Sequence, residues 1–240
     1  MKSLIVLLFS AVLAIDVSAR TIYIVGDSTA SIKASEDRPE TGWGEAFGNA
    51  LSDATILKNV ARNGRSTRSF VAEGRWQAVA DQLNEGDIVL IQFGHNDQKL
   101  YDYKRFVDPW RDYPLYLRLF IDDAREKGAY PVLLTPIARR KFDADGHVIQ
   151  THRPYAQVMR DLARALDVPL IDTNAFSRNW LLSIGEQASK NYFLHLPPDL
   201  NPNYPDGIAD DTHLNEKGAQ VIADFVAEEL KRLRAPYSDF

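Results

Sequence analysis

Two short segments near opposite ends of the sequence contain the residue types needed for acyl transfer to a serine. Ser28 lies in the motif GDSTA, directly after an apolar stretch, and His213 ends the motif DDTH. A serine hydroxyl is a poor nucleophile at neutral pH, so it needs an imidazole to accept its proton and a carboxylate to orient that imidazole. Asp210 and Asp211 are competing candidates for the carboxylate.

Two blocks between these segments could stabilise the negative charge that develops in such a reaction. Gly64 lies in the motif NVARNGRS and Asn96 in the motif QFGHND. A backbone N–H and a side-chain amide are suitable donors for an oxyanion hole. Ser28 alone could equally be a helix N-cap, for which serine is favoured. Because the four blocks occur together, we expect Ser28 to be the nucleophile and His213 the base.

At these residues the sequence resembles the SGNH (GDSL-type) hydrolases, named for a Ser, a Gly, an Asn and a His in four separate blocks. Here these residues are Ser28, Gly64, Asn96 and His213. In this family the triad carboxylate lies three residues before the histidine, which implies Asp210. The resemblance also implies an oxyanion hole formed by the backbone N–H groups of Ser28 and Gly64 and the amide of Asn96.

The motifs GWG at 42–44, GRSTRSF at 64–70 and GHND at 94–97 further resemble the rhamnogalacturonan acetylesterase branch of carbohydrate esterases. That resemblance implies an esterase that removes acetyl groups from a plant polysaccharide or oligosaccharide, with rhamnogalacturonan as the first choice, and that uses no cofactor. One alternative is a lipase, aryl esterase or thioesterase with the same site. A second alternative is a non-catalytic carbohydrate-binding protein, which the presence of both Ser28 and His213 disfavours.

Four further residues are candidates for substrate contact, and each has a structural alternative. Trp43, between two glycines, could form a site wall or belong to the core. Arg65 could bind substrate or fix its loop through a salt bridge, and His95 could bind substrate or order its turn. Arg139 begins a basic run that could meet galacturonate carboxylates or be a solvated charge cluster.

Composition excludes several other classes of function. The net charge of −5 disfavours a nucleic-acid partner, and the lack of cysteine excludes disulfides and thiolate metal sites. His147, His152 and His195 do not have the helical spacing of a zinc motif, so no metal is expected. We expect no stable membrane association and a monomer.

The first 19 residues have the features of a secretory signal peptide. Lys2 precedes an apolar stretch, and Val17-Ser18-Ala19 offers small residues for cleavage. We therefore expect residues 20–240 to form a single domain of an exported protein, either periplasmic or secreted.

Apolar runs rich in β-branched residues predict five buried parallel strands at 21–25, 55–60, 87–93, 130–135 and 168–171. Segments of helical period alternate with them, at 76–83, 115–127, 155–166 and 216–233. The sequence thus predicts an α/β fold, a three-layer αβα sandwich with a central, mostly parallel five-stranded sheet. The family resemblance implies its flavodoxin-like form. The functional blocks follow strands, where the ligand crevice of such sheets lies.

Overall fold

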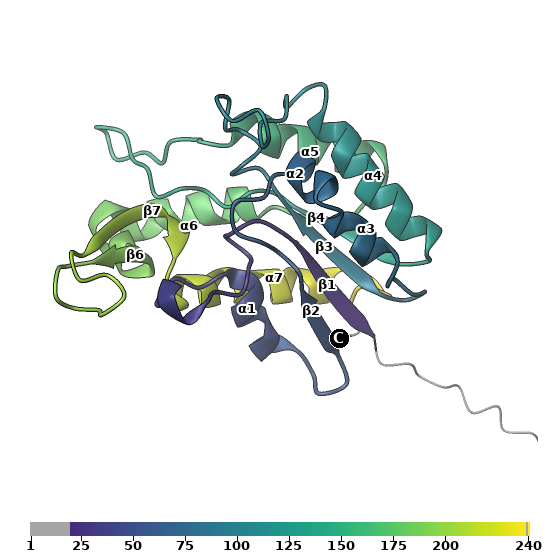
Figure 1. Ribbon diagram of the computed structural model, residues 1–240, viewed down its shortest axis with the longest axis horizontal. Helices are drawn as coiled ribbons and strands as arrows, with labels where there is room; N and C mark the ends of the chain where they lie inside the picture. Colours follow the sequence, from purple (N-terminus) through teal and green to yellow (C-terminus); the bar gives the residue numbers. More distant parts are fainter. Residues whose placement is uncertain (1–19, 239) are drawn as a thin grey trace, which may run out of the picture.

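A five-stranded parallel sheet forms the centre of the molecule (Figure 1). The computed structural model describes residues 20–238 and 240, so the expected signal peptide at 1–19 lies outside the described residues. The strand order is β2-β1-β3-β4-β5, and every neighbouring pair is parallel. The strands are β1 (Thr21–Gly26), β2 (Ile56–Asn59), β3 (Ile88–Gln92), β4 (Tyr130–Leu134) and β5 (Leu170–Ile171). The predicted sheet is confirmed.

Helices cover both faces of the sheet, which gives three layers (Figure 1). The alternation of side chains along β1 shows this division. Ile22 and Ile24 pack into a core shared with α1 and α7, whereas Tyr23 and Val25 pack into a second core shared with α2 to α5. The helices are α1 (Trp43–Ala46), α2 (Thr67–Ala72), α3 (Arg75–Ala80), α4 (Tyr113–Glu126), α5 (Arg153–Ala165), α6 (Thr173–Ser189) and α7 (Glu216–Arg232).

The four predicted helices correspond to α3, α4, α5 and α7; the short helices α1 and α2 were not predicted, and neither were two larger features. One is α6, which is interrupted by the non-helical backbone of Gly185. The other is an antiparallel hairpin of β6 (Phe193–Leu196) and β7 (Ile208–Leu214), whose strands are joined by the proline-rich segment 197–207. β7 contains Asp210 and His213, and most of its residues are partly exposed, so it lacks the continuous apolar run of a buried strand.

The topology places the functional blocks around one edge of the sheet. β2 and β3 lie on opposite sides of β1, so the strand order reverses there, and ligands of such sheets bind outside the carboxyl ends of these strands. Ser28 follows β1, Gly64 follows β2 and Asn96 follows β3. A Cβ atom at Gly42 would lie 2.2 Å from the carbonyl oxygen of Ser31, so the segment before α1 packs directly on the Ser28 turn only because residue 42 is glycine.

Candidate active site

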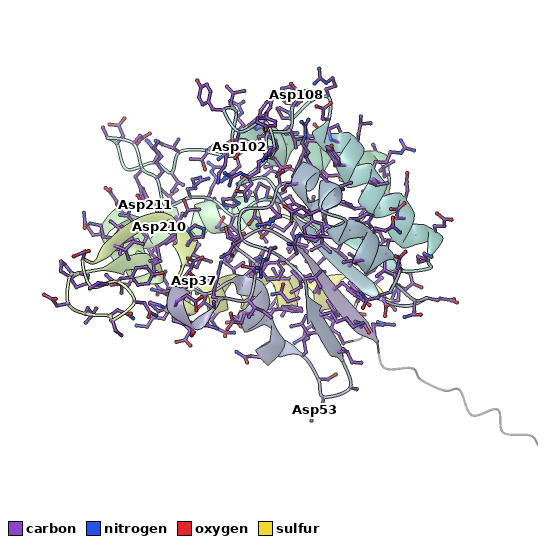
Figure 2. All side chains as sticks on the ribbon, in the orientation of Figure 1. Asp37, Asp53, Asp102, Asp108, Asp210 and Asp211 are labelled. Carbon is purple, nitrogen blue, oxygen red and sulfur yellow. The ribbon has the colours of Figure 1, made fainter. Side chains whose placement is uncertain are left out.

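Ser28, His213 and Asp210 form a continuous hydrogen-bonded chain. Ser28 Oγ lies 2.9 Å from His213 Nε2, and His213 Nδ1 lies 2.7 Å from Asp210 Oδ2. Asp210 Oδ1 accepts hydrogen bonds from the backbone N–H groups of Thr212 at 2.6 Å and His213 at 3.0 Å. Figure 2 shows Asp210 on β7, while Ser28 belongs to the turn after β1. The structure therefore brings the expected nucleophile Ser28 together with the expected base and acid, His213 and Asp210, which lie near the other end of the sequence.

The electrostatics of this chain favour an ionised Asp210. Burial opposes the charge, but the hydrogen bonds from His213 and Thr212 and the charge of His213 outweigh it and lower the pKa of Asp210 to about 2. An ionised carboxylate at Nδ1 keeps the proton of the neutral imidazole on that nitrogen. Nε2 then has its lone pair free to accept the proton of the Ser28 hydroxyl.

The expected oxyanion donors lie on segments that contact one another, since Asn63, next to Gly64, accepts hydrogen bonds from Ser31 and Lys33. The backbone N–H groups of Ser28 and Gly64 have no hydrogen-bond partner among the described residues. Gly64 has a φ of +75°, a conformation that side chains disfavour. The side-chain nitrogen of Asn96 donates to the carbonyl oxygen of Arg65 at 3.1 Å, which ties the Asn96 turn to the Gly64 loop and leaves the second amide hydrogen for another acceptor.

Trp43 and His95 are buried, which corresponds to the structural alternative for each of them. Trp43 has no exposed surface, and its indole N–H donates to Gln92 at 2.7 Å. It belongs to the core because a large aromatic side chain at the start of α1 points at the sheet. His95 is only 3% exposed and packs against His152, with 4.1 Å between the ring centroids and 54° between the ring planes.

His95 also faces the buried Asp27, with 3.4 Å between Nδ1 and Oδ2. Burial lowers the pKa of His95 more than Asp27 raises it, so the imidazole is neutral and the contact is not an ion pair. Asp27 is instead held by the backbone N–H and the hydroxyl of Thr29, at 2.9 and 2.8 Å. Asp27 thereby orders the turn that presents Ser28.

Arg65 and Arg139, the two other candidates for substrate contact, lie near the Ser28 site. Arg65 binds Glu73 and donates to the carbonyl oxygen of Asn63 at 2.8 Å, so it fixes the peptide group that carries the N–H of Gly64. Arg139 donates to the hydroxyl of Thr212, the residue before His213. Burial lowers the pKa of Arg139, while Asp27 and Asp210 oppose that change. Arg140, beside it, pairs with Asp211 at 2.6 Å.

Sequence reasoning missed three buried charges near the site. Lys33 contacts the Ser28 turn, and Glu40 lies near His213. These two residues belong to no motif, so only the folded backbone brings them to the site. Asp97, in contrast, lies in the QFGHND motif. Its carboxylate accepts a hydrogen bond from the backbone N–H of Thr67 at 2.9 Å. Burial raises the pKa of Asp97 to about 7, although hydrogen bonds from Thr67 oppose the rise.

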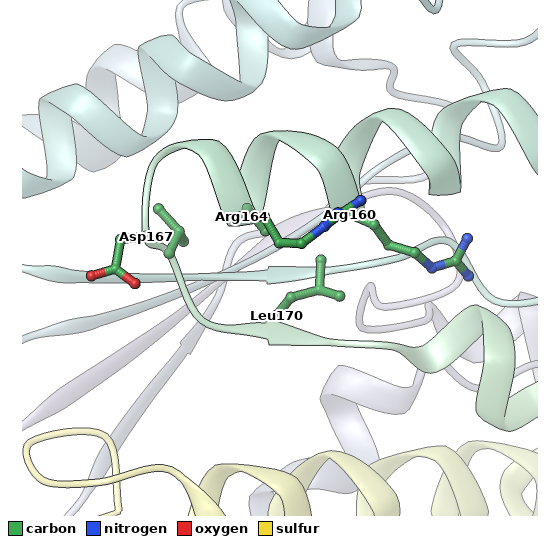
Figure 3. A pocket seen from close by; sticks show the side chains of 6 residues that line it. Arg160, Arg164, Asp167 and Leu170 are labelled. Atoms are coloured by element: carbon green, nitrogen blue, oxygen red, sulfur yellow. The ribbon is translucent and has the colours of Figure 1, made fainter.

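A pocket of about 610 Å³ lies away from Ser28, between the end of α5 and β5. Figure 3 shows Arg160, Arg164, Asp167 and Leu170 around it. Arg160 is already paired with Asp172, and Arg164 with Asp161. None of the residues that line this pocket belongs to the four motif blocks, so the pocket does not contain the groups needed for acyl transfer.

Among residues 20–238 and 240, one group has side chains close enough to share a metal ion: Asp143, Asp145 and His147. All three are exposed, and none belongs to the Ser28 site. In the same residues, no helix is sufficiently long and apolar to cross a bilayer.

Comparison with known proteins agrees with this geometry. The GDSL-like Lipase/Acylhydrolase family matches residues 24–221. Rhamnogalacturonan acetylesterase RhgT of Bacillus subtilis is 44% identical, over 91% of this chain and 92% of its own length. A rhamnogalacturonan acetylesterase of Emericella nidulans is 28% identical, over 86% of this chain and 82% of its own length.

A similar solved structure is that of the protein YxiM from Bacillus subtilis, with a TM-score of 0.71 and 27% identity. The match covers 89% of this chain and 56% of that one. An acetyl-xylooligosaccharide esterase from Geobacillus stearothermophilus, with a TM-score of 0.65 and 18% identity, shares the fold over 88% of this chain and 94% of its own. The fold, the arrangement of the four blocks and the extent of these matches lead to one conclusion: this chain belongs to the GDSL-like lipase/acylhydrolase family and is an esterase.

Proposed function

We propose that this esterase removes acetyl groups from rhamnogalacturonan through an acyl-enzyme on Ser28. The observation that carries the mechanism is the hydrogen-bonded chain from Ser28 through His213 to Asp210. The substrate is inferred from the 44% identity to a rhamnogalacturonan acetylesterase over nearly the whole chain.

The reaction proceeds in two halves. His213 Nε2 accepts the proton of Ser28 Oγ as the oxygen attacks the acetyl carbonyl carbon, and the resulting oxyanion accepts hydrogen bonds from Ser28, Gly64 and Asn96. The carbon–oxygen bond to the sugar then breaks, and the leaving sugar oxygen takes the proton from Nε2. Water attacks the acetyl-enzyme in the same way, with His213 as base, and acetate leaves. No cofactor takes part in these steps.

Cationic side chains beside the oxyanion loop favour an acidic polymer as substrate. A pocket of about 280 Å³ is lined by Gly64, Arg65, Ser69, Glu73, Asp102, Lys104 and Arg105. Arg65 and Arg105 pair with Glu73 and Asp102, whereas no carboxylate pairs with Lys104 among the described residues. The pocket therefore has a net positive charge, suited to the carboxylate of an acidic sugar next to the acetylated one. Arg139 would supply a further cation near His213.

Aromatic side chains extend this surface. Tyr101 is fully exposed and Tyr103 is 77% exposed, both on the loop that contains Asp102. Exposed aromatic rings in a polar loop are suited to stacking on sugar rings. We infer that a polysaccharide chain runs over this loop towards Ser28.

We also propose that the enzyme is exported, to the periplasm or beyond, and acts there as a monomer. Cleavage after Ala19 would leave Arg20 as the mature N-terminus. N-terminal sequencing of the exported protein should begin at Arg20, whereas an exported protein that retains Met1 would contradict cleavage.

The substrate proposal is tested by acetate release from a panel of acetylated polymers and esters. We expect acetylated rhamnogalacturonan to give the highest kcat/KM, above acetylated homogalacturonan and acetylated xylan. A preference for medium-chain acyl esters would favour a lipase or aryl esterase instead. A Ser28→Ala variant serves as the background control in every assay.

A further inference from the structure

Lys33 is a fully buried cation that joins two parts of the candidate active site. Its side chain has no exposed surface, and its ammonium group lies 2.6 Å from Glu40 Oε1. The same Nζ donates to the carbonyl oxygen of Ser28 at 2.5 Å and to Asn63 Oδ1 at 2.8 Å. Burying an ammonium group is unfavourable unless such partners surround it. Lys33 therefore connects the nucleophile turn with the residue that precedes Gly64.

Glu40 links this cation to the catalytic base. Glu40 Oε1 lies 3.9 Å from His213 Nε2, and the Glu40 side chain is only 12% exposed. Lys33 Nζ lies 2.6 Å from the same Oε1, so this oxygen lies between the ammonium group and the imidazole. The backbone at Glu40 forms an antiparallel bridge to Asn215, and Thr41 N–H donates to the Leu214 carbonyl at 2.9 Å. Glu40 is thus attached to the strand that carries His213.

We propose that Lys33 and Glu40 form a buried positioning pair for catalysis, in which Lys33 holds the Ser28 turn against the Gly64 loop and Glu40 stabilises the His213 imidazolium. The proposal rests on the proposed Ser28–His213 mechanism. In the resting site Nε2 accepts the Ser28 hydroxyl hydrogen, so it offers Glu40 no proton. Once the proton moves from Oγ to Nε2, a positive charge develops 3.9 Å from Glu40 Oε1.

Glu40 itself neither gains nor loses a proton in this scheme. The proton passes from Ser28 Oγ to His213 Nε2 and then to the leaving sugar oxygen, and the carboxylate only stabilises the intermediate charge. Lys33 balances the Glu40 charge in the resting site, where the imidazole is neutral. The pair therefore limits the penalty of keeping a second carboxylate buried beside the base.

The charged groups around His213 determine the sign of the expected effect. They are Asp210 at Nδ1, Glu40 near Nε2, Lys33 behind Glu40 and Arg139 beside Thr212, while the buried His95 is a neutral titratable group. Replacing Glu40 with glutamine leaves two cations, Lys33 and Arg139, opposed by Asp210 alone. The imidazolium then forms less readily, both in the transition state and in the free enzyme.

The test uses an aryl acetate and compares Glu40→Gln with the exposed Glu36→Gln as a matched control. We expect Glu40→Gln to lower kcat by roughly tenfold, as a loss of charge stabilisation in the transition state would, with little change in KM. The acid limb of the pH profile of kcat/KM should move to lower pH, because neutral His213 persists to lower pH. Glu36→Gln should match the wild type in kcat and in the pH profile of kcat/KM.

A direct titration of His213 by NMR in histidine-labelled protein separates this role from a purely structural one. We expect His213 to be protonated at lower pH in Glu40→Gln than in the wild type, and Glu40→Asp, which retains the charge, to fall between them. Glu40→Asp also keeps Lys33 paired, so it provides a folded variant if Glu40→Gln does not fold. An unshifted His213 titration in a folded variant would overturn the role of Glu40, even if activity fell.

Lys33 is tested by Lys33→Met, for which we expect a lower kcat and an unchanged KM for the same aryl acetate. Wild-type kcat in this variant would overturn the role of Lys33. The failure of the mechanism itself is distinguishable, because acetyl-ester hydrolysis by Ser28→Ala at the wild-type rate would contradict the triad whatever the Glu40 variants show.

Discussion

Asp210 Oδ2 lies 2.7 Å from His213 Nδ1, three residues further along β7. Asp211, the next residue, instead contacts Arg140 Nη1 at 2.6 Å and His195 Nε2 at 2.8 Å. The pairing of β7 with β6 is irregular here, because Leu194 pairs with Asp210 and Phe193 with Leu214, so residues 211–213 bulge and His213 turns back to Asp210. Asp211 takes part in a separate network. Only Asp210 can orient the imidazole.

Asp210→Asn should therefore lose most of the activity, by up to about 10⁴-fold, because an amide at this position favours the wrong imidazole tautomer. Asp211→Asn should retain much more, since it affects only the Arg140 and His195 contacts. The measurement is kcat/KM for an aryl acetate. The reverse order of the two variants would show that the assignment of the acid is wrong.

Asp210 should also make a pH-dependent contribution to stability. Its pKa is lowered from 3.8 to about 2 in the folded protein, so the folded state favours the ionised form. This contribution is present above pH 4 and is lost as the pH falls towards 2. Urea unfolding of the wild type and Asp210→Asn should show a wild-type advantage in free energy of unfolding that shrinks over this range. A wild-type advantage in the free energy of unfolding that grows as the pH falls would contradict the predicted sign of this contribution.

Asn96→Ala should reduce turnover by about 10²- to 10³-fold while KM for an acetyl ester changes little. The reason is that the Asn96 amide is proposed to meet charge that develops only in the transition state. Because Asn96 also holds the Arg65 carbonyl, thermal unfolding of the variant is measured as a control. An increase in KM at constant kcat would assign Asn96 to ground-state binding instead.

The cationic pocket beside Gly64 should affect acidic substrates selectively. Lys104→Gln and Arg105→Gln should each raise KM for acetylated rhamnogalacturonan several-fold and should weaken the dependence of KM on salt, because exposed charges are screened. KM for neutral acetylated xylan should stay unchanged, and Lys127→Gln, an exposed lysine at the end of α4, provides the control. Equal effects on both polymers would argue against recognition of acidic sugars.

Much of this organisation can be predicted from the sequence, because buried parallel strands are continuous apolar runs and the functional blocks directly follow three of them. Ile88–Gln92, for example, is entirely buried and could be recognised from its composition. The four motif blocks then predict Ser28, Gly64, Asn96 and His213 as site residues.

Other features depend on tertiary contacts that leave no local signal. β7 is half exposed and contains two aspartates and a histidine, so neither alternation nor apolar content indicates a strand. From the sequence, Trp43 could be a site wall or a core residue, because its flanking glycines do not reveal that they serve close packing on the Ser28 turn. Lys33 and Glu40 become recognisable only when the segment after Ser28 folds back onto β7.

The central claim is that acetyl transfer passes through Ser28. The most direct measurement is peptide mapping by mass spectrometry of enzyme quenched in acid during turnover of an acetyl ester. We predict one acetyl group on the peptide that contains Ser28 in the wild type, with neither the adduct nor hydrolysis above background in Ser28→Ala. An acetyl group on a different residue during turnover, or hydrolysis by Ser28→Ala at the wild-type rate, would contradict the mechanism.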